Sequence, residues 1–428
     1  MTRPPLHPLP DALRLLLQGV GPRDGLERVP LAEACGRVLA SDQLSVLDLP
    51  PWDNSAMDGY AVNHADAGRR LPVTLRIAAG DPPGRLGESA AARIFTGAPL
   101  PSGADAVLMQ EDARFEGDEI RVSDHVRAGQ HVRRRGEECQ VGERILAAGR
   151  RLRPQDIGML AAQGFAEVDV KPQLRVALLS TGSELVEPGT AAPEPGLIYN
   201  SNRPMLLALL RALGCSAVDL GNVQDSAEAT RAALKEAAAS SDLIISTGGV
   251  SVGEEDHVRS AVDALGELTL WRIAVKPGKP FAHGRVGHCP FIGLPGNPAS
   301  AFVTFLLLAR PWIERRQGRS ESRRLRFTAR ADFSRDGSAG REEYLRVVLE
   351  SQPGAAGGIE FAWKADTSGN ASRGETGDRA LWATPFRNQS SGILRSVSAA
   401  DALACVPAGR PVKQGDEVEV LPLDQLLS

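Results

Sequence analysis

The chain has 428 residues, of which 42% are hydrophobic and 24% are charged, and its formal net charge at pH 7 is -4. This length exceeds one ordinary hydrophobic core, so the usual domain size predicts roughly three domains. The composition is typical of a soluble globular protein, and the negative charge argues against a general nucleic-acid-binding protein. No stretch approaches the roughly 18 apolar residues of a membrane span, so no membrane partner is expected.

The five cysteines are far apart, odd in number and never spaced as Cys-x-x-Cys. This pattern disfavours a disulfide framework or a zinc knuckle, and it fits a reducing cytosol best. The first ten residues lack the apolar core of a signal peptide. We therefore expect a cytoplasmic protein.

In chain order, residues 11–40 have apolar positions at helical spacing, which predicts helices. From about 45 to 140, short β-like runs cut by Gly and Pro predict a small β-rich domain. A helix is expected at 154–163, with Pro154 in its first turn and Gly164 beyond its end.

Residues 174 to about 318 alternate strand and helix, which is typical of βαβ units with a parallel sheet. After Arg324 the alternating segments predict a small all-β C-terminal domain. The expected strands of the α/β part are 176–179, 217–220, 243–246 and 291–294, and its expected helices are 204–213, 226–239 and 298 to about 314.

Three of these strands run into glycine-bearing loops: Thr181-Gly182-Ser183-Glu184, Gly248-Gly249, and Pro295-Gly296-Asn297-Pro298. Ligands of parallel sheets bind beyond the carboxyl ends of the strands, so the three loops predict one composite pocket. Without Cβ atoms at Gly248 and Gly249, consecutive N–H groups could face a phosphate or an oxyanion. Asn297 is expected to cap the next helix and to leave its positive end facing outward.

Carboxylates also follow expected parallel strands, at Glu184, Asp225 and Asp256. Asp225 and Asp256 also precede predicted helices, so helix capping is a competing interpretation of both. Three carboxylates at the same edge of a sheet repel one another unless a cation lies among them. We expect Mg²⁺, because it takes one or two protein carboxylates and fills its other positions with water and substrate oxygens.

Between Asp256 and the last glycine loop, Lys276-Pro277-Gly278-Lys279-Pro280 carries two lysines on a stiff turn, which could also be only an exposed turn. Lysines and a helix N-terminus beside acidic metal ligands describe a site for a phosphorylated or oxyanionic substrate. In the β-rich region, the segments around Asp58-Gly59 and Thr96-Gly97 could each be only turns.

Seven segments, taken together and in order, resemble the molybdopterin molybdenumtransferase family, which is related to the E domain of gephyrin. The resemblance covers nearly the whole chain. The segments are Ser55-Ala56-Met57-Asp58-Gly59-Tyr60-Ala61, Thr96-Gly97-Ala98-Pro99, Arg133-Arg134-Arg135-Gly136-Glu137, Ser180-Thr181-Gly182-Ser183-Glu184-Leu185, Thr247-Gly248-Gly249-Val250-Ser251-Val252-Gly253 through Asp256, Lys276-Pro277-Gly278-Lys279-Pro280 and Leu294-Pro295-Gly296-Asn297-Pro298.

The resemblance implies magnesium-dependent insertion of molybdate into adenylated molybdopterin with release of AMP. It also implies a homodimer of four-domain subunits, in which the β-rich insert of one subunit faces the α/β domain of the other. The implied domains are a linking domain split between 1–44 and 141–173, a β-rich inserted domain at 45–140, an α/β molybdopterin-binding domain at 174–325 and a C-terminal β domain at 326–428.

The resemblance further implies roles for individual residues. Glu184, Asp225 and Asp256 become candidates for magnesium and substrate contacts, and Asp58 and Thr96 for the part of the catalytic site contributed across the dimer. The implied substrate-binding residues are Thr181, Gly182, Ser183, Gly248, Gly249, Ser251, Lys276, Lys279, Pro295 and Pro298. Glu138 stands where the family commonly carries Asp, so its carboxylate reaches one methylene further.

Lysines, backbone N–H groups and a metal would offset the repulsion between two anionic substrates, and no protein nucleophile is needed. One alternative is a molybdopterin adenylyltransferase, whose whole fold resembles residues 174–318 but which has a shorter glycine loop and lacks the surrounding domains. The other is a non-catalytic scaffold. Docking with the adenylyltransferase and with recipient molybdoenzymes is left open.

Overall fold

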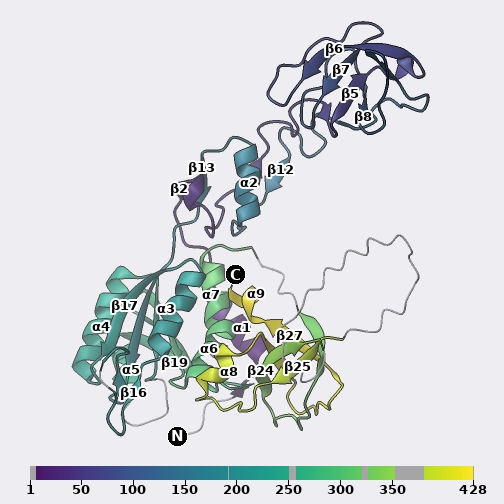
Figure 1. The fold of residues 1–428 in the computed structure, drawn as a ribbon. Helices are drawn as coiled ribbons and strands as arrows, with labels where there is room; N and C mark the ends of the chain where they lie inside the picture. The colour runs from purple at the N-terminus through teal and green to yellow at the C-terminus, as the bar shows by residue number, and fades with distance from the viewer. Residues whose placement is uncertain (1–5, 191, 250–256, 321–325, 352–379, 428) are drawn as a thin grey trace. The chain divides into compact units, whose positions relative to one another are not determined.

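The computed structural model describes residues 6–190, 192–249, 257–320, 326–351 and 380–427. The chain divides into two compact units (Figure 1). Unit 1 comprises residues 1–27, 36–38 and 170–428, and unit 2 comprises residues 28–35 and 39–169. Among the described residues, no helix has the length and apolar character needed to cross a membrane.

Unit 1 is built on a seven-stranded sheet with the order β1-β19-β21-β22-β18-β14-β17. Continuous apolar runs such as Val176 to Leu179 form its buried strands, as expected where helices cover both faces. The strands are β1 Leu6–His7, β14 Arg175–Thr181, β17 Ser216–Val223, β18 Leu243–Thr247, β19 Gly266–Ile273, β21 Pro280–Val286 and β22 Cys289–Leu294.

The four strands β17, β14, β18 and β22 are parallel, which confirms the predicted parallel-type sheet. Their last residues are in register, because Thr181 pairs with Val223, Ser180 with Thr247, and Thr247 with Leu294. The loops that follow these strands therefore leave the sheet side by side. We call this surface the carboxyl edge and define it by residues 181–184, 225, 247–249 and 295–298.

The sheet is not parallel throughout, because β21 is antiparallel to both β22 and β19. The hairpin between β21 and β22 turns at Gly287, whose φ of 59° lies in the left-handed region that favours glycine. The sequence alternation did not predict this reversal, since the short turn replaces the helix that a parallel connection requires.

Helices cover both faces of the sheet because successive residues of a strand point to opposite sides. Val176 and Leu178 of β14 belong to the cluster packed by α3 and α6, whereas Ala177 and Leu179 belong to the cluster packed by α4 and α5. The helices are α3 Asn202–Ala212, α4 Ala227–Ser240, α5 His257–Leu265, α6 Pro298–Thr304 and α7 Arg310–Arg316, with a π-helical turn at Phe305–Ala309 between the last two.

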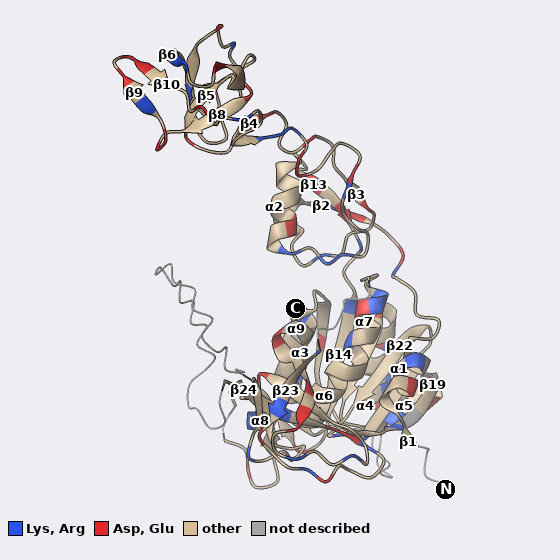
Figure 2. Ribbon diagram, turned by 90° about the vertical axis from the view of Figure 1, so that its right-hand side faces the viewer, with Lys and Arg blue, Asp and Glu red and all other residues tan. Residues whose placement is uncertain are grey.

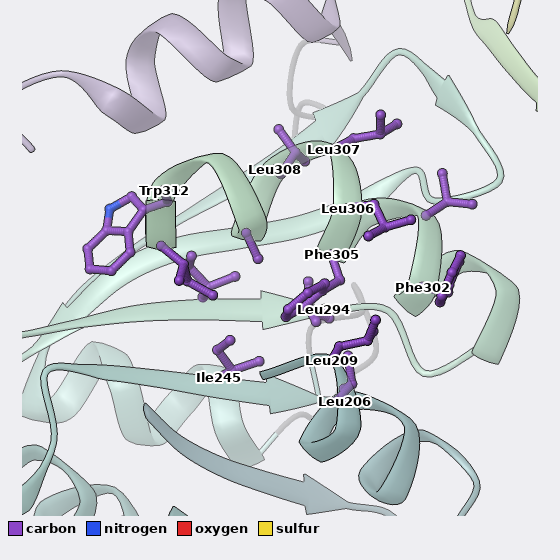
Figure 3. Close-up of a cluster of buried hydrophobic side chains, with 14 of the residues drawn as sticks. Leu206, Leu209, Ile245, Leu294, Phe302, Phe305, Leu306, Leu307, Leu308 and Trp312 are labelled. Carbon is purple, nitrogen blue, oxygen red and sulfur yellow. The ribbon is translucent and has the colours of Figure 1, made fainter. Parts of the chain in front are cut away.

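The first of these clusters is large and shared by several parts of unit 1. Figure 3 shows Leu206 and Leu209 of α3 near Ile245 of β18, Leu294 of β22 and Phe305. Full burial of one such side chain stabilises the fold by about 1.5–3 kcal/mol relative to exposure. The same cluster includes Leu403 and Leu421 from the C-terminal segment, so the sheet and that segment share a core.

Helix α1, Leu9–Leu17, also joins this core through its buried residues Leu9, Ala12 and Leu16. The structure thus groups α1 with the α/β part, whereas the expected division assigned residues 1–44 to a linking domain. The helix expected toward residue 40 does not form. Instead β2 Glu27–Pro30 is followed by a 3-10 turn at Leu31–Glu33, because Pro30 and Gly36, with φ of 81°, interrupt the helical pattern.

The C-terminal segment forms a closed five-stranded barrel, as expected for an all-β domain. The sheet order β24-β25-β23-β27-β26 closes through an additional pairing of β24 with β26. A sixth strand, β20, pairs with β24. The elements are β20 Val275–Lys276, β23 Phe327–Ala331, β24 Glu342–Glu350, β25 Trp382–Pro385, α8 Leu394–Ser398, β26 Ala402–Val406, β27 Glu417–Pro422 and α9 Leu423–Leu427.

Unit 2 contains a six-stranded sheet with the order β8-β5-β7-β6-β10-β9. Two separate hydrophobic clusters, around Ile94 and Leu71, form its core. The sheet strands are β5 Gly59–Val62, β6 Arg70–Ile77, β7 Ala91–Ile94, β8 Ala106–Met109, β9 Arg114–Glu116 and β10 Glu119–Arg121.

Two-stranded pairs β11-β4, β12-β3 and β13-β2 and the helix α2 complete unit 2. Helix α2, Pro154–Ala162, has Pro at its start and ends before Gly164, with φ of 81°, as predicted. The remaining strands of the chain are β3 Gln43–Leu44, β4 Asn54–Ser55, β11 Val132–Arg133, β12 Arg144–Leu146 and β13 Glu167–Val170, with β15 Leu185–Val186 and β16 Ile198–Tyr199 in unit 1.

Candidate functional site

The loop after β14 begins at the buried Thr181 and turns at Gly182, whose φ is 149°. A Cβ built on Gly182 would lie 2.7 Å from a carboxylate oxygen of Glu184. Glycine at this position therefore lets the Glu184 carboxylate fold back over the loop, while Ser183 and Glu184 are both exposed.

The loop after β18 needs both of its glycines. Gly248 and Gly249 have φ of 87° and 65°, in the left-handed region. A Cβ on Gly248 would lie 2.8 Å from the carbonyl oxygen of Thr181, and one on Gly249 would lie 2.4 Å from Val258 Cγ2. The N–H of Gly248 donates to Leu294 O at 3.2 Å, so it does not face a ligand as the sequence suggested. The lack of a side chain at Gly248 instead allows the loops after β14 and β18 to pack closely.

The loop after β22 leads into α6 as predicted. Asn297 occupies the N-cap position, although its side chain makes no capping bond, and Pro298 is the first helical residue. Pro295 O accepts a hydrogen bond from Thr247 Oγ1 at 3.3 Å, so the two prolines bracket a loop tied to β18. The N–H of Ala299 donates to Ser391 O at 3.0 Å, so part of the α6 N-terminus is already bonded to the C-terminal segment.

Two asparagines that were not predicted from the sequence form hydrogen bonds to these loops and to the ends of the strands before them. Asn200 Nδ2 donates to Ser180 Oγ of β14 at 2.7 Å. Asn202 Nδ2 donates to Thr247 Oγ1 at 2.9 Å and to Gly296 O at 2.7 Å. Both asparagines are nearly inaccessible, with 1% and 8% exposure. Asn200 and Asn202 reach these three strand ends only in the folded chain, so no local sequence pattern could reveal their role.

The lysine loop lies between β20 and β21 and is anchored to the C-terminal barrel. Lys276 Nζ forms an ion pair of 3.0 Å with Glu343 Oε1 of β24, whose side chain is only 7% exposed. Gly278, with φ of 110°, packs so closely on α6 that a Cβ would lie 2.4 Å from Thr304 Cγ2. The main chain of Lys279 accepts a hydrogen bond from Ile273 N at 2.8 Å. Lys276 is therefore held by a partner from another part of unit 1.

A buried arginine, Arg346, adds positive charge next to this ion pair. It is 1% exposed, and its guanidinium donates to Ser396 Oγ at 3.1 Å, Tyr344 O at 3.2 Å and Ser390 O at 3.3 Å. Burial lowers the pKa of Arg346 to about 10, although the nearby Glu343 carboxylate opposes this shift. Arg346 remains cationic at neutral pH, and it belongs to the same barrel strand as Glu343.

The predicted carboxylates are only partly described. Glu184 and Asp225 are exposed and follow adjacent strands at the carboxyl edge. The helix-capping interpretation of Asp225 is wrong, because Ser226 is the N-cap of α4 and its side chain accepts from Ala229 N at 3.2 Å. Asp256 and Ser251 lie outside the described residues. No group of three or more potential metal-ligating His, Cys, Asp or Glu side chains occurs within the described ranges.

In unit 2, the structure brings the two predicted site residues Asp58 and Thr96 together. Asp58 Oδ1 accepts from Thr96 N at 2.8 Å and from Thr96 Oγ1 at 2.7 Å. The hydrogen bond from the Thr96 N–H, followed by that from its hydroxyl, holds the pKa of Asp58 below its usual value. The segment is thus more than an Asp-Gly turn, because it links two loops of the β-rich region.

Glu138 is exposed and lies 3.9 Å from Arg133 Nη2, while its N–H donates to Leu49 O. The neighbouring basic run is neutralised by ion pairs. They join Arg133 to Glu137, Arg134 to Asp53 and Arg135 to Asp48. Basic and acidic residues are likewise interspersed along the chain in Figure 2. The run therefore serves the fold of this region rather than forming an unpaired basic patch.

The fold and these loops define a multidomain α/β protein with a molybdopterin-binding-type domain. Residues 7–164 match the model for the MoeA N-terminal region (domain I and II), 177–315 the probable molybdopterin binding domain, and 371–423 the MoeA C-terminal region (domain IV). The chain belongs to the molybdopterin molybdenumtransferase family. This confirms the family suggested by the sequence.

Individual relatives agree with this assignment. The chain is 41% identical over 325 residues to the molybdopterin molybdenumtransferase of Haemophilus influenzae, covering 75% of this chain and 80% of that protein. It is 34% identical to the enzyme of the same name from Nostoc sp., covering 99% and 96%. A crystal structure of the molybdopterin biosynthesis moeA protein from Pyrococcus horikoshii matches with a TM-score of 0.79 and 29% identity, covering 98% of this chain and 100% of that one.

Proposed function

We propose that this protein is a molybdopterin molybdenumtransferase, which inserts molybdate into the dithiolene of adenylated molybdopterin and releases AMP. The observation that carries the proposal is the convergence of three glycine-bearing loops at the carboxyl edge, in a unit that also holds the cations Lys276 and Arg346. Such an arrangement suits an anionic substrate, because positive groups fixed in advance stabilise negative charge without reorganisation. The chain's relatives carry the name of this activity.

The alternatives are less well supported. The family matches outside the α/β part, at 7–164 and 371–423, favour the transferase over an adenylyltransferase that would lack these regions. The presence of both lysines and of Glu184 and Asp225 favours an enzyme over a non-catalytic scaffold. A cytoplasmic location stays a prediction from the cysteine pattern.

Magnesium dependence is part of the proposal, and the described residues fit this ion. Glu184 and Asp225 are exposed carboxylates on loops from adjacent strands, and neither forms an ion pair or a side-chain hydrogen bond with another described residue. Magnesium takes one or two protein carboxylates and completes its shell with water and substrate oxygens. We propose Glu184, Asp225 and Asp256 as the residues that would hold it. When bound, the ion would offset negative charge on the phosphate and the molybdate.

The chain's own residues would bind and orient the two anions. Lys276 and Lys279 are proposed to contact molybdate or phosphate, with Lys276 held in place by Glu343. Thr181, Gly182, Ser183, Gly248, Gly249 and Ser251 would line the position of the pterin and its phosphate, and Pro295 and Pro298 would shape the last loop. The cleaved phosphoanhydride supplies the driving force, so no protein nucleophile is proposed.

We also propose a homodimer in which Asp58 and Thr96 of one subunit complete the site of the other. The two hydrogen bonds that Asp58 accepts from the Thr96 N–H and hydroxyl support a common role, since they fix the Asp58 carboxylate beside the Thr96 hydroxyl. Glu138 remains a candidate member of this part of the site. Docking with an adenylyltransferase or with recipient molybdoenzymes stays a prediction.

The test is AMP release from adenylated molybdopterin by the purified protein, with and without molybdate and magnesium. We expect release to require both, and Asp225→Asn to lower kcat/KM at least tenfold at a fixed magnesium concentration. Glu236→Gln is the matched control, because Glu236 is an exposed carboxylate near the far end of α4. Release without molybdate, or adenylylation of molybdopterin by ATP, would contradict the proposed activity.

A further inference from the structure

We infer that Asn202 is a positioning residue whose side-chain amide sets the spacing between the loop after β18 and the loop after β22. The inference rests on the proposed function, because it assigns those two loops to the substrate. Asn202 is the first residue of α3 and is 8% exposed. Its side-chain amide carries no charge, so its role comes from its hydrogen bonds.

The two donors of Asn202 reach both loops. Nδ2 donates to Thr247 Oγ1 at the end of β18, at 2.9 Å, and to Gly296 O between β22 and α6, at 2.7 Å. The orientation of the amide is fixed, because a backbone carbonyl such as Gly296 O can only accept a hydrogen bond. Thr247 Oγ1 in turn donates to Pro295 O at 3.3 Å, so the same two loops are joined a second time.

The remaining polar atom of this side chain has no partner in the described part of the chain. Asn202 Oδ1 is buried and makes no hydrogen bond to any described residue. A buried acceptor without a donor costs folding free energy, so an amide is a poor choice here for stability alone. The two N–H donors are therefore the part of the side chain that matters here. An unpaired buried acceptor is expected mainly where function, and not stability, constrains a residue.

The loops after β18 and β22 approach each other through glycines, which have no side chains of their own to set the spacing. A Cβ on Gly296 would lie 3.9 Å from Gly248 Cα, and a Cβ on Gly248 would lie 2.8 Å from Thr181 O. Just before Asn202, Asn200 Nδ2 donates to Ser180 Oγ of β14 at 2.7 Å. The residues at the start of α3 thus bond to three of the four strand ends at the carboxyl edge, those of β14, β18 and β22, and Asn202 makes two of these links.

Asn202→Ala removes both donors without adding volume. We expect it to raise KM for adenylated molybdopterin at least tenfold, with a smaller change in kcat, because the loops would no longer be held at the distance the substrate needs. The dissociation constant for molybdopterin alone, measured through its pterin fluorescence, should rise by a similar factor. This second measurement needs neither magnesium nor turnover.

Gln317→Ala provides the matched control. Gln317 is also a buried amide of unit 1, its Nε2 donates to Leu213 O at 2.7 Å, and its Oε1 has no hydrogen-bond partner among the described residues. It lies just beyond the end of α7, outside the carboxyl edge. We expect Gln317→Ala to lower the melting temperature about as much as Asn202→Ala does, and to leave both KM and the molybdopterin dissociation constant unchanged.

Thr247→Val covers the case in which Asn202→Ala does not fold, because it removes only the hydroxyl that links the same two loops. A smaller rise in KM is expected from it, and its effect should not add to that of Asn202→Ala. The inference is overturned if folded Asn202→Ala or Thr247→Val binds molybdopterin like the wild type, or if Gln317→Ala weakens binding equally. Failure of the wild type to release AMP would instead contradict the proposed activity, and the binding measurements would still decide the role of Asn202.

Discussion

Lys276 owes its position to Glu343, a carboxylate that lies far away in the sequence and is nearly buried. The ion pair of 3.0 Å joins the lysine loop to the barrel strand β24, and the strand pairing of Lys276 with Glu343 fixes the same register through the main chain. A lysine on a turn is ordinarily free to choose among many rotamers, and ordering it costs entropy. The ion pair with Glu343 restricts the lysine rotamers in the absence of substrate, so less entropy is lost when the substrate binds.

Glu343→Gln should therefore weaken the interaction of the protein with molybdate. We expect the molybdate concentration for half-maximal AMP release to rise severalfold, and to rise further in Lys276→Met. The loss in stability should be only about 1 kcal/mol, because Lys276 is 43% exposed and solvent screens the pair. Glu419→Gln, which removes an exposed ion pair with Arg326 in the same barrel, should change neither quantity.

The hydrogen bonds that Asp58 accepts from Thr96 should be detectable in the titration of the Asp58 carboxyl group. Because the folded state holds the pKa of Asp58 below the unfolded value of about 3.9, its contribution to stability is present above that pH and is lost as pH falls through the folded pKa. We expect the amide resonance of Thr96 to shift in this acidic range, and Asp58→Asn to abolish the shift. A transition at or above the ordinary carboxyl pKa would show that the two bonds do not persist in solution.

Among the elements, the lysine turn depends on the glycine between its two lysines. Gly278→Ala would place a Cβ 2.4 Å from Thr304 Cγ2, and the residue must keep a φ of 110°. Thr304 cannot easily turn away, because it is buried and its hydroxyl donates to Ser300 O at 2.7 Å. We expect a loss of about 2–4 kcal/mol in the free energy of unfolding, from the combined clash and backbone strain.

Gly287→Ala is the control for this change, because Gly287 also has a positive φ, of 59°, but has no atom within 4 Å of the added Cβ. It should cost only about 1 kcal/mol, the usual penalty for a left-handed alanine. Chemical denaturation of both variants gives the comparison. Equal losses would mean that the loop shifts freely to accept the methyl group and is not fixed by α6.

Local signals explain which elements were predicted correctly. Helix α4 was expected at 226–239 and forms at Ala227–Ser240, because a serine cap and a helical apolar pattern agree there. At 31–40 the apolar pattern was equally helical, but Pro30 and Gly36 prevented the helix. Strands β19 and β21 were not among the predicted strands, so the antiparallel part of the sheet was missed.

The same distinction holds for the candidate site. Glycines and prolines that shape loops are visible as sequence patterns, and Gly182, Gly248 and Gly249 do lie at the carboxyl edge. Asn202, Glu343 and Arg346 were not predicted as site residues, because their partners at Gly296, Lys276 and Ser390 are distant in sequence. A single buried asparagine or arginine carries no local pattern, so only the fold could reveal these residues.

For the whole molecule, the hydrophobic clusters described above each lie within one unit. Phe305 belongs to the core shared by the sheet and the barrel segment, and Ile94 belongs to a core of the β-rich sheet. A chain with separate cores need not unfold in one transition. We expect two calorimetric transitions, one for each unit.

Phe305→Ala and Ile94→Ala should identify these transitions. Each removes a fully buried side chain, at a cost of about 3–5 and 2–5 kcal/mol respectively. Phe305→Ala should lower the melting temperature of one transition, and Ile94→Ala that of the other. If either substitution lowered both transitions equally, the two units would be unfolding as a single cooperative body.

The pairing of β2 with β13 has a consequence for the evolution of this protein. These strands carry the polypeptide into unit 2 and back out, at Glu27–Pro30 and Glu167–Val170, and they are hydrogen-bonded neighbours. Paired strands lie about 5 Å apart, so a linker of a few residues could reconnect the chain there. The segment between these strands, which includes the β-rich insert and α2, thus has the form of an insertion that recombination could gain, lose or exchange, although its residues 36–38 belong to unit 1.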